Sequence, residues 1–102
     1  MSDKTGPMFS IVCATYNRAD LLPRAIDSVL AQSFRCWELI IVDDGSTDNT
    51  PLMIQRYLSD ARIKYIKNDS NNGVGYCRNM GIKTSQAQWV VLLDSDNAFL
   101  PT

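Results

Sequence analysis

Short apolar segments alternate with amphipathic segments along almost the whole chain, and this alternation restricts the possible folds more than any other feature. Apolar and β-branched residues form strand-like segments at 8–14, 37–42, 62–67 and 89–93. Between them, apolar residues recur at three- and four-residue steps, which predicts helices over about 20–32, 50–58 and 74–84. The order β-α-β-α-β-α-β predicts parallel strands joined by right-handed crossovers.

The predicted fold is a Rossmann-like α/β sheet with the strands in the order 3-2-1-4. Residues 62–67 alternate charged and bulky side chains, which is typical of an edge strand, whereas the uninterrupted apolar run 89–93 predicts a buried strand. The strand order changes direction between the first and fourth strands. Because ligands bind at such a switch point, beyond the carboxyl ends of the strands, we expect 15–16, 43–44 and 94–96 to meet at one rim.

Two helix starts are also indicated by the residue types. Asp20 precedes the first apolar repeat and is a predicted N-cap, with Pro23 in the first turn, where its missing N–H costs little. Thr50 followed by Pro51 predicts an N-cap and a first helical residue. The segment 52–58 would then supply the buried side of the second helix through Leu52, Met53, Tyr57 and Leu58.

Length and composition exclude several classes of protein. At 102 residues the chain is one domain or part of one, and its net charge of −1 offers no basic field for nucleic acid or a membrane surface. Without histidine the chain cannot build a Ser-His-Asp site, and zinc loses its usual ligand. Three widely spaced cysteines favour a reducing cytoplasm, and no apolar run reaches the roughly 18 residues of a membrane span. We set residues 1–7 aside as a disordered or expression-derived lead and assign 8–102 to the domain.

Asp94 and Asp96 leave the carboxyl end of the last strand one residue apart. On an extended segment their side chains would point the same way, and two like charges at such a distance repel unless a cation joins them. Carboxylate oxygens suit Mg²⁺ or Mn²⁺, which could in turn hold a diphosphate. The competing interpretation is a solvated turn, because short acidic triplets are common.

The other rim residues suit a nucleotide. The carboxylates of Asp43 and Asp44 can accept hydrogen bonds from base N–H groups or ribose hydroxyls, although they could also cap the second helix. Tyr16 could stack on a base or simply pack. Gly73 begins a helix whose N-terminus favours anions, and Arg78 could reach a phosphate, pair with the rim carboxylates or form a surface ion pair.

Taken together, these segments resemble the start of a family-2 glycosyltransferase of the GT-A fold. The similar segments are SIV followed by ATYN within 10–17, LAQSF at 30–34, WELIIVDDGSTD at 37–48, NG at 72–73 with CRNMGI at 77–82, and DSD at 94–96. The NG and CRNMGI pieces are similar to that family's N-x-G-x-x-x-A-R-N-x-G segment, and DSD stands where the family has its DxD. The resemblance covers nearly all of 9–101, in order and at matching spacing.

The resemblance implies a nucleotide-sugar donor, most readily a UDP-sugar, held with Mg²⁺ or Mn²⁺. Thr15, Tyr16 and Asp44 would contact the nucleoside, Arg78 would lie near the nucleotide, and Asp94 and Asp96 would serve the ribose and the metal, with Asp96 the direct ligand. The full set of expected nucleotide-binding residues is Ala14, Thr15, Tyr16, Asn17, Asp43, Asp44, Gly73, Arg78, Asp94 and Ser95. Two residues depart from the family's pattern. Ala14 stands where many members carry proline or threonine, and Cys77 stands where alanine is usual.

The resemblance also implies what this stretch would lack. Such domains run well past this length, and the acceptor side, with the base of an inverting transfer, follows the DxD. We therefore expect the nucleotide-binding half only, with no catalytic residue and no transferase activity alone. The longer protein would transfer the sugar to a saccharide or lipid-linked glycan acceptor in polysaccharide biosynthesis. It would be cytoplasmic or lie at the inner membrane face.

Three alternatives compete with this interpretation. A haloacid-dehalogenase-type phosphatase also has DxD after a strand, but it wants Thr or Val where Ala98 stands and places the motif at the start of the domain. A receiver-like module would carry its acid pair after the first strand and a lysine after the fifth strand that completes the site, and this sequence has neither feature. The chain could also act as an oligomerising module, and the free edge of its last strand predicts a homodimer.

Overall fold

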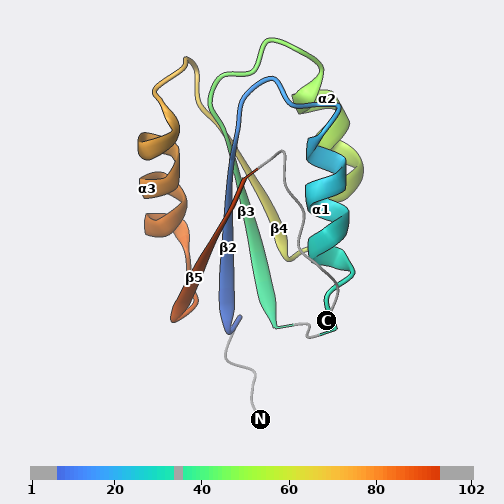
Figure 1. Ribbon diagram of the computed structural model, residues 1–102, viewed down its shortest axis with the longest axis vertical. Helices are drawn as coiled ribbons and strands as arrows, with labels where there is room; N and C mark the ends of the chain where they lie inside the picture. Colours follow the sequence, from blue (N-terminus) through green and yellow to red (C-terminus); the bar gives the residue numbers. More distant parts are fainter. Residues whose placement is uncertain (1–6, 34–35, 95–102) are drawn as a thin grey trace.

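A computed structural model describes residues 7–33 and 36–94. Its centre is a four-stranded parallel sheet in the order β4-β3-β2-β5 (Figure 1). The strands are β2 (Phe9–Thr15), β3 (Trp37–Asp43), β4 (Ile63–Lys67) and β5 (Trp89–Asp94). In chain order this arrangement is 3-2-1-4, so the predicted topology is confirmed. The segment 63–67 lies at one edge, as its charge alternation indicated.

Helices cover both faces of the sheet (Figure 1). They are α1 (Leu22–Leu30), α2 (Thr50–Ile54) continued by the 3-10 turn η1 (Gln55–Tyr57), and α3 (Val74–Thr84). α1 and α2 lie on one face and α3 on the other. The prediction of one continuous α-helix over 50–58 is wrong, because the chain tightens after Ile54. Within α2 it is Ile54 that is buried, whereas Leu52 is 75% exposed, contrary to its predicted burial.

Both predicted N-caps differ from those in the structure. The N-cap of α1 is Leu21, which forms no side-chain cap bond, because the carbonyl of Arg18 accepts the N–H groups of Leu21 and Leu22 instead. Asp20 is therefore not the N-cap of α1. The N-cap of α2 is Asn49, and Thr50 is already helical. Capping is provided by Asp48, whose carboxylate accepts both the N–H and the hydroxyl of Thr50.

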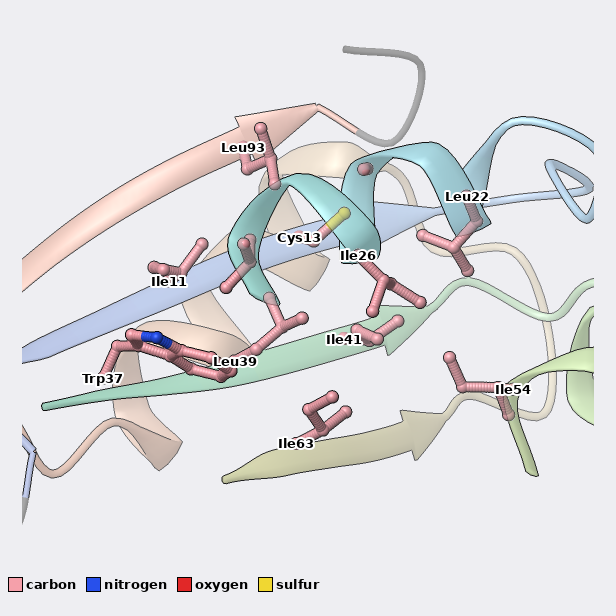
Figure 2. Close-up of a cluster of buried hydrophobic side chains, with 12 residues drawn as sticks. Ile11, Cys13, Leu22, Ile26, Trp37, Leu39, Ile41, Ile54, Ile63 and Leu93 are labelled. Carbon is pink, nitrogen blue, oxygen red and sulfur yellow. The ribbon is translucent and has the colours of Figure 1, made fainter. Parts of the chain in front are cut away.

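Two apolar layers arise from the alternation of side chains along the central strands. Ile11, Cys13, Leu39 and Ile41 face α1, and together with Leu22, Ala25, Ile26 and Val29 they form the larger core (Figure 2). The intervening residues Ile40 and Val42 face α3 and pack on Cys77. β2 and β3 are thus covered on both sides, which explains their near-continuous apolar sequences.

β5 differs from the buried strand that its sequence predicted. Only Leu93 is buried among its residues, whereas Trp89 and Leu92 are 59% and 47% exposed. The reason is position: within the described residues β5 pairs on one side alone, with β2. Among the described residues, the outer edge of β5 is therefore free, as expected.

The buried carboxylate of Glu38 lies near the amino-terminal ends of β2 and β3. Glu38 accepts hydrogen bonds from Ser10 Oγ (2.5 Å), Lys64 Nζ (2.8 Å) and the N–H of Gln86 (2.7 Å). Burial raises the pKa of Glu38, but these donors outweigh burial and hold the pKa below its ordinary value of 4.5. Ser10 also accepts the N–H of Ala87, so the network fastens the start of β2 to the chain entering β5.

Acidification is expected to destabilise the fold through Glu38. Because the pKa is lower in the folded chain than in the unfolded one, the stabilisation is complete above pH 4.5 and is lost as the pH falls through the folded pKa. Thermal unfolding of the wild type and Glu38→Gln, from about pH 7 to about pH 3, should show a shallower fall in Tm for the variant. Parallel Tm curves would contradict this role.

Candidate functional site

A cavity of about 330 Å³ lies at the carboxyl ends of the central strands, beside the N-terminus of α3. Its lining comes from the loop after β2, the end of β3 and the chain entering α3. The lining residues are Ala14, Thr15, Tyr16, Asn17, Arg18, Asp44, Asn71, Gly73, Val74 and Cys77. Six of these are among the expected nucleotide-binding residues, and the fold brings them together at this cavity. They are Ala14, Thr15, Tyr16, Asn17, Asp44 and Gly73.

Asp44 forms a buried, charged wall of the cavity. Its carboxylate accepts the N–H groups of Asn72 and Gly73, each at 2.8 Å, and the side-chain amide of Asn68 at 3.2 Å. Burial raises the pKa of Asp44, but these N–H donors and the Cys77 thiol outweigh burial and hold the pKa below its ordinary value of 3.8. Asp44 is therefore an ionised acceptor at neutral pH, even though its residue is only 5% exposed.

The same contacts change the interpretation of the α3 N-terminus. Gly73 is the N-cap and adopts a φ of +98°, a conformation that favours glycine. The helix begins at Val74, as predicted, but its N-terminal region already receives a negative charge from Asp44. Asp44 thus anchors α3 rather than capping α2, which was the competing interpretation from sequence.

Tyr16 stands on the rim with 42% of its surface exposed. The backbone on either side is fastened to the loop after β3: the carbonyl of Thr15 accepts the N–H of Asp44, and the N–H of Asn17 is donated to Ser46 Oγ. The Tyr16 ring is therefore presented at the cavity by a held backbone. The hydroxyl of Thr15 is buried and has no hydrogen-bond partner within the part of the chain that the structure describes.

Asp43 does not line the cavity, although it precedes Asp44 directly. Its carboxylate accepts the N–H of Ser46 and the hydroxyl of Tyr65, and the residue is fully buried. Successive side chains of a strand point to opposite faces, so only one member of the pair can face α3. In this structure Asp43 supports the turn after β3.

Arg78 and Asp94 form an ion pair next to the cavity, with 2.9 Å between Arg78 Nη2 and Asp94 Oδ1. Asp94 is the register partner of Ala14 across the β2–β5 ladder, which places it at the same rim. Of the three possibilities left open for Arg78, the structure shows an exposed ion pair with a carboxylate at the rim, and contact of Arg78 with a phosphate stays a prediction. Ser95 and Asp96 lie outside the described residues, and within 7–33 and 36–94 no three potential metal-ligating His, Cys, Asp or Glu side chains cluster together.

Sequence reasoning missed four lining residues and one supporting residue. Arg18, Asn71, Val74 and Cys77 line the cavity, and Asn68 holds Asp44 from behind. The Asn-rich loop 68–72 was a visible signal, since it leads into the predicted helix. Cys77 is buried at the α3 face, and burial together with its hydrogen bond to Asp44 raises its pKa to about 12, so it remains a thiol.

Residues 10–102 match the family model described as glycosyl transferase family 2. The chain belongs to this family. The match covers all four strands of the observed sheet except Phe9 at the start of β2. It does not favour the phosphatase, receiver or purely oligomerising interpretations. Family-2 membership and the α/β topology therefore support the resemblance inferred from the sequence.

Named relatives include bacterial proteins of polysaccharide biosynthesis. WcaA of Escherichia coli (strain K12), provisionally assigned to colanic acid biosynthesis, is 44% identical over 96% of this chain and 36% of its own length. WfgD of Escherichia coli, a UDP-Glc:alpha-D-GlcNAc-diphosphoundecaprenol beta-1,3-glucosyltransferase, is 34% identical over 91% of this chain and 36% of its own. The chain thus spans about a third of the length of these relatives.

Solved structures give the same fold. Staphylococcus aureus TarS 1-349 in complex with UDP-GlcNAc superposes with a TM-score of 0.84 and 30% identity, over 88% of this chain and 27% of that one. A Pyrobaculum calidifontis mannosyltransferase, PcManGT, solved with GDP-Man and Mn²⁺, has a TM-score of 0.84 at 23% identity, over 94% and 29%. This second likeness supports the fold alone. No helix among residues 7–33 and 36–94 is long and apolar enough to cross a membrane.

Proposed function

We propose that residues 8–102 are the donor-binding half of a glycosyltransferase domain and bind the nucleoside diphosphate of a nucleotide-sugar. The observation that carries this proposal is the switch-point cavity, which an ionised Asp44 and an exposed Tyr16 border. An acceptor-only carboxylate suits base N–H groups, and an aromatic ring offers a face on which a base can stack. A UDP-sugar is the proposed donor, supported by the UDP-GlcNAc complex of TarS.

The remaining rim residues would engage the rest of the nucleotide. Ala14 and Gly73 line the cavity and would present backbone close to the ligand. The positive charge of Arg78, beside Asp94, would face the diphosphate. Its partner Asp94 retains an oxygen that the ion pair does not occupy and could meet the ribose. Asp43 would contribute by holding the turn that carries Asp44, rather than by touching the nucleotide.

The donor set at the rim fits Mg²⁺ or Mn²⁺. Asp94 is a hard oxygen ligand with an exposed side chain, and Asp96 would supply the second carboxylate. Two carboxylates suffice for such an ion, because it takes its other ligands from substrate phosphates and water. When bound, the ion would neutralise the diphosphate leaving group.

We place the acceptor site and the general base of an inverting transfer in the remainder of the longer protein. The proposed acceptor is a saccharide or a lipid-linked glycan, in line with the diphosphoundecaprenol-linked substrate in the name of WfgD. Work on such an acceptor would put the longer protein in the cytoplasm, at the inner face of a membrane. Residues 8–102 alone would then bind the donor without transferring the sugar.

Calorimetric titration of the chain with UDP, GDP, CDP and dTDP, with and without Mn²⁺, tests the proposal. UDP should bind, and Mn²⁺ should strengthen the binding. Asp96→Ala should remove the Mn²⁺ effect, whereas Asp20→Ala, which removes an equal charge at an exposed position outside the cavity, should not. If none of the four nucleotides binds under either condition, the proposed function is wrong.

We also propose that the chain by itself forms a homodimer through the free edge of β5. The other edge strand, β4, carries Lys64 and Lys67, which discourage pairing, whereas β5 exposes Trp89, Val90 and Leu92 and bears no lysine. An antiparallel pairing of two β5 strands would be self-complementary around a two-fold axis.

Sedimentation velocity should therefore show mass rising with concentration. Leu92→Lys should give a monomer because it places a charge in the paired edge. Leu52→Lys makes the same substitution at an exposed leucine on α2, away from that edge, and should still dimerise. A wild-type mass that stays monomeric at every concentration would contradict the dimer. It would leave this edge to another strand of the longer protein.

A further inference from the structure

Asn17 takes part in four of the hydrogen bonds that join the loop after β2 to the loop after β3. Another runs from the N–H of Ala19 to Asp48 Oδ2 at 3.2 Å. Asn17 Oδ1 accepts the N–H of Thr47 at 2.8 Å and the N–H of Asp48 at 3.1 Å. Asn17 Nδ2 donates a hydrogen bond to Thr47 Oγ1 at 3.3 Å, and the backbone N–H of Asn17 donates one to Ser46 Oγ at 2.8 Å. These four hydrogen bonds link the loop after β2 to the loop after β3, which lie together at the top of Figure 1.

Asn17 also has an unusual backbone. Its φ of +51° lies in the left-handed region, and it is the only non-glycine residue with a positive φ in the described part of the chain. Asparagine tolerates this region better than most residues, because its short side chain can bond nearby backbone groups. Here the side chain bonds across to the other loop, and we call its hydrogen bonds to Thr47 and Asp48 the clamp. The left-handed backbone and the clamp support each other.

We propose that Asn17 is a positioning residue for the donor nucleotide, a role that rests on the proposed function. The clamp stands between the two groups assigned to the base: Tyr16 precedes Asn17, and the 46–48 loop follows Asp44. Both groups are thereby held before a ligand arrives. Rigid placement reduces the ordering cost of binding, so the clamp should contribute to affinity without touching the nucleotide.

A series at position 17 separates the side-chain clamp from the backbone strain. Asn17→Gly keeps the left-handed φ at no steric cost and removes the side-chain bonds, so the chain should fold and bind UDP at least about tenfold more weakly. Asn17→Asp keeps an Oδ acceptor for the two N–H groups and should recover part of the affinity. Ser10→Ala is the matched control, because it removes buried hydrogen bonds at the opposite end of β2. It should lower Tm while leaving the Kd for UDP unchanged.

A double-mutant cycle with Tyr16→Ala gives a readout that a general loss of stability would not change. Because Asn17 places Tyr16 as well as the loop after Asp44, the double variant should lose less affinity for UDP than the sum of the two single losses. Affinity losses that simply add would overturn the proposal, as would wild-type affinity in Asn17→Gly. If Asn17→Gly does not fold, the same cycle with Asn17→Asp decides in the same way. Failure of the wild type to bind any nucleotide would instead overturn the proposed function, and the positioning role with it.

Discussion

Replacing Asp44 by alanine is expected to abolish measurable UDP binding and to destabilise the fold at the same time. The substitution removes the ionised wall of the cavity and leaves the N–H groups of Asn72 and Gly73 without their acceptor. A fully buried donor without a partner costs about 1–3 kcal/mol. Because these two are only partly buried, we expect a loss of about 2–4 kcal/mol in the free energy of unfolding, below the upper end for two fully buried donors. Affinity should fall by a factor of roughly 100 or more, since both the base acceptor and the α3 loop are affected.

Urea denaturation and UDP titration of the same samples measure the two effects. Asp60→Ala is the matched control, because Asp60 also holds a backbone N–H and an arginine, both from Arg62, but lies outside the cavity. It should lose stability and keep the wild-type affinity for UDP. A folded Asp44→Ala chain that binds UDP as the wild type does would rule out Asp44 as the base acceptor.

The second large effect is expected for Gly81→Ala, where α3 packs against Val12 of β2. A Cβ at Gly81 would lie 2.3 Å from Val12 Cγ1 and 3.1 Å from Val12 Cγ2. Helix propensity alone would favour alanine by about 1 kcal/mol. The branched, buried side chain of Val12 has little room to move, so the clash should prevail and reduce the free energy of unfolding by about 1–3 kcal/mol.

Thermal unfolding shows whether the steric clash with Val12 or the gain in helix propensity prevails. Each kcal/mol should move Tm by roughly 4–8 °C in a domain of this size. Gly75→Ala is the control in the same helix, because its Cβ would meet nothing within 4 Å, and it should leave Tm equal or slightly higher. The double variant Val12→Ala/Gly81→Ala should recover part of the stability that Gly81→Ala loses. An increase of Tm in Gly81→Ala would show that α3 lies farther from β2 than this structure has it.

The sheet and its order could be predicted because they follow from periodicity and handedness. Apolar runs at 9–15 and 37–43 need cover on two faces, and the crossover rule leaves few ways to arrange four parallel strands. The rim position of Tyr16 and Asp44 follows directly, since both come just after strands that run in the same direction. The pairing of Arg78 with Asp94 was also among the predicted possibilities.

Local details failed where longer-range contacts decided them. Asp20 looked like a cap, but the Arg18 carbonyl forms that turn, and the second helix tightens into a 3-10 turn after Ile54. The apolar sequence of β5 predicted burial, yet burial depends on a neighbour along the sheet as well as on composition.

The sequence by itself determined the α/β alternation, the strand order and the meeting of acids and an aromatic ring at the switch point. Only the tertiary structure decided what each polar atom does there. Asp43 faces the turn and Tyr65, Asp44 holds the start of α3, and Asn17 joins the two loops. The physical reason is that periodicity specifies which face a residue takes, whereas a hydrogen bond between loops about 30 residues apart depends on the path of both backbones.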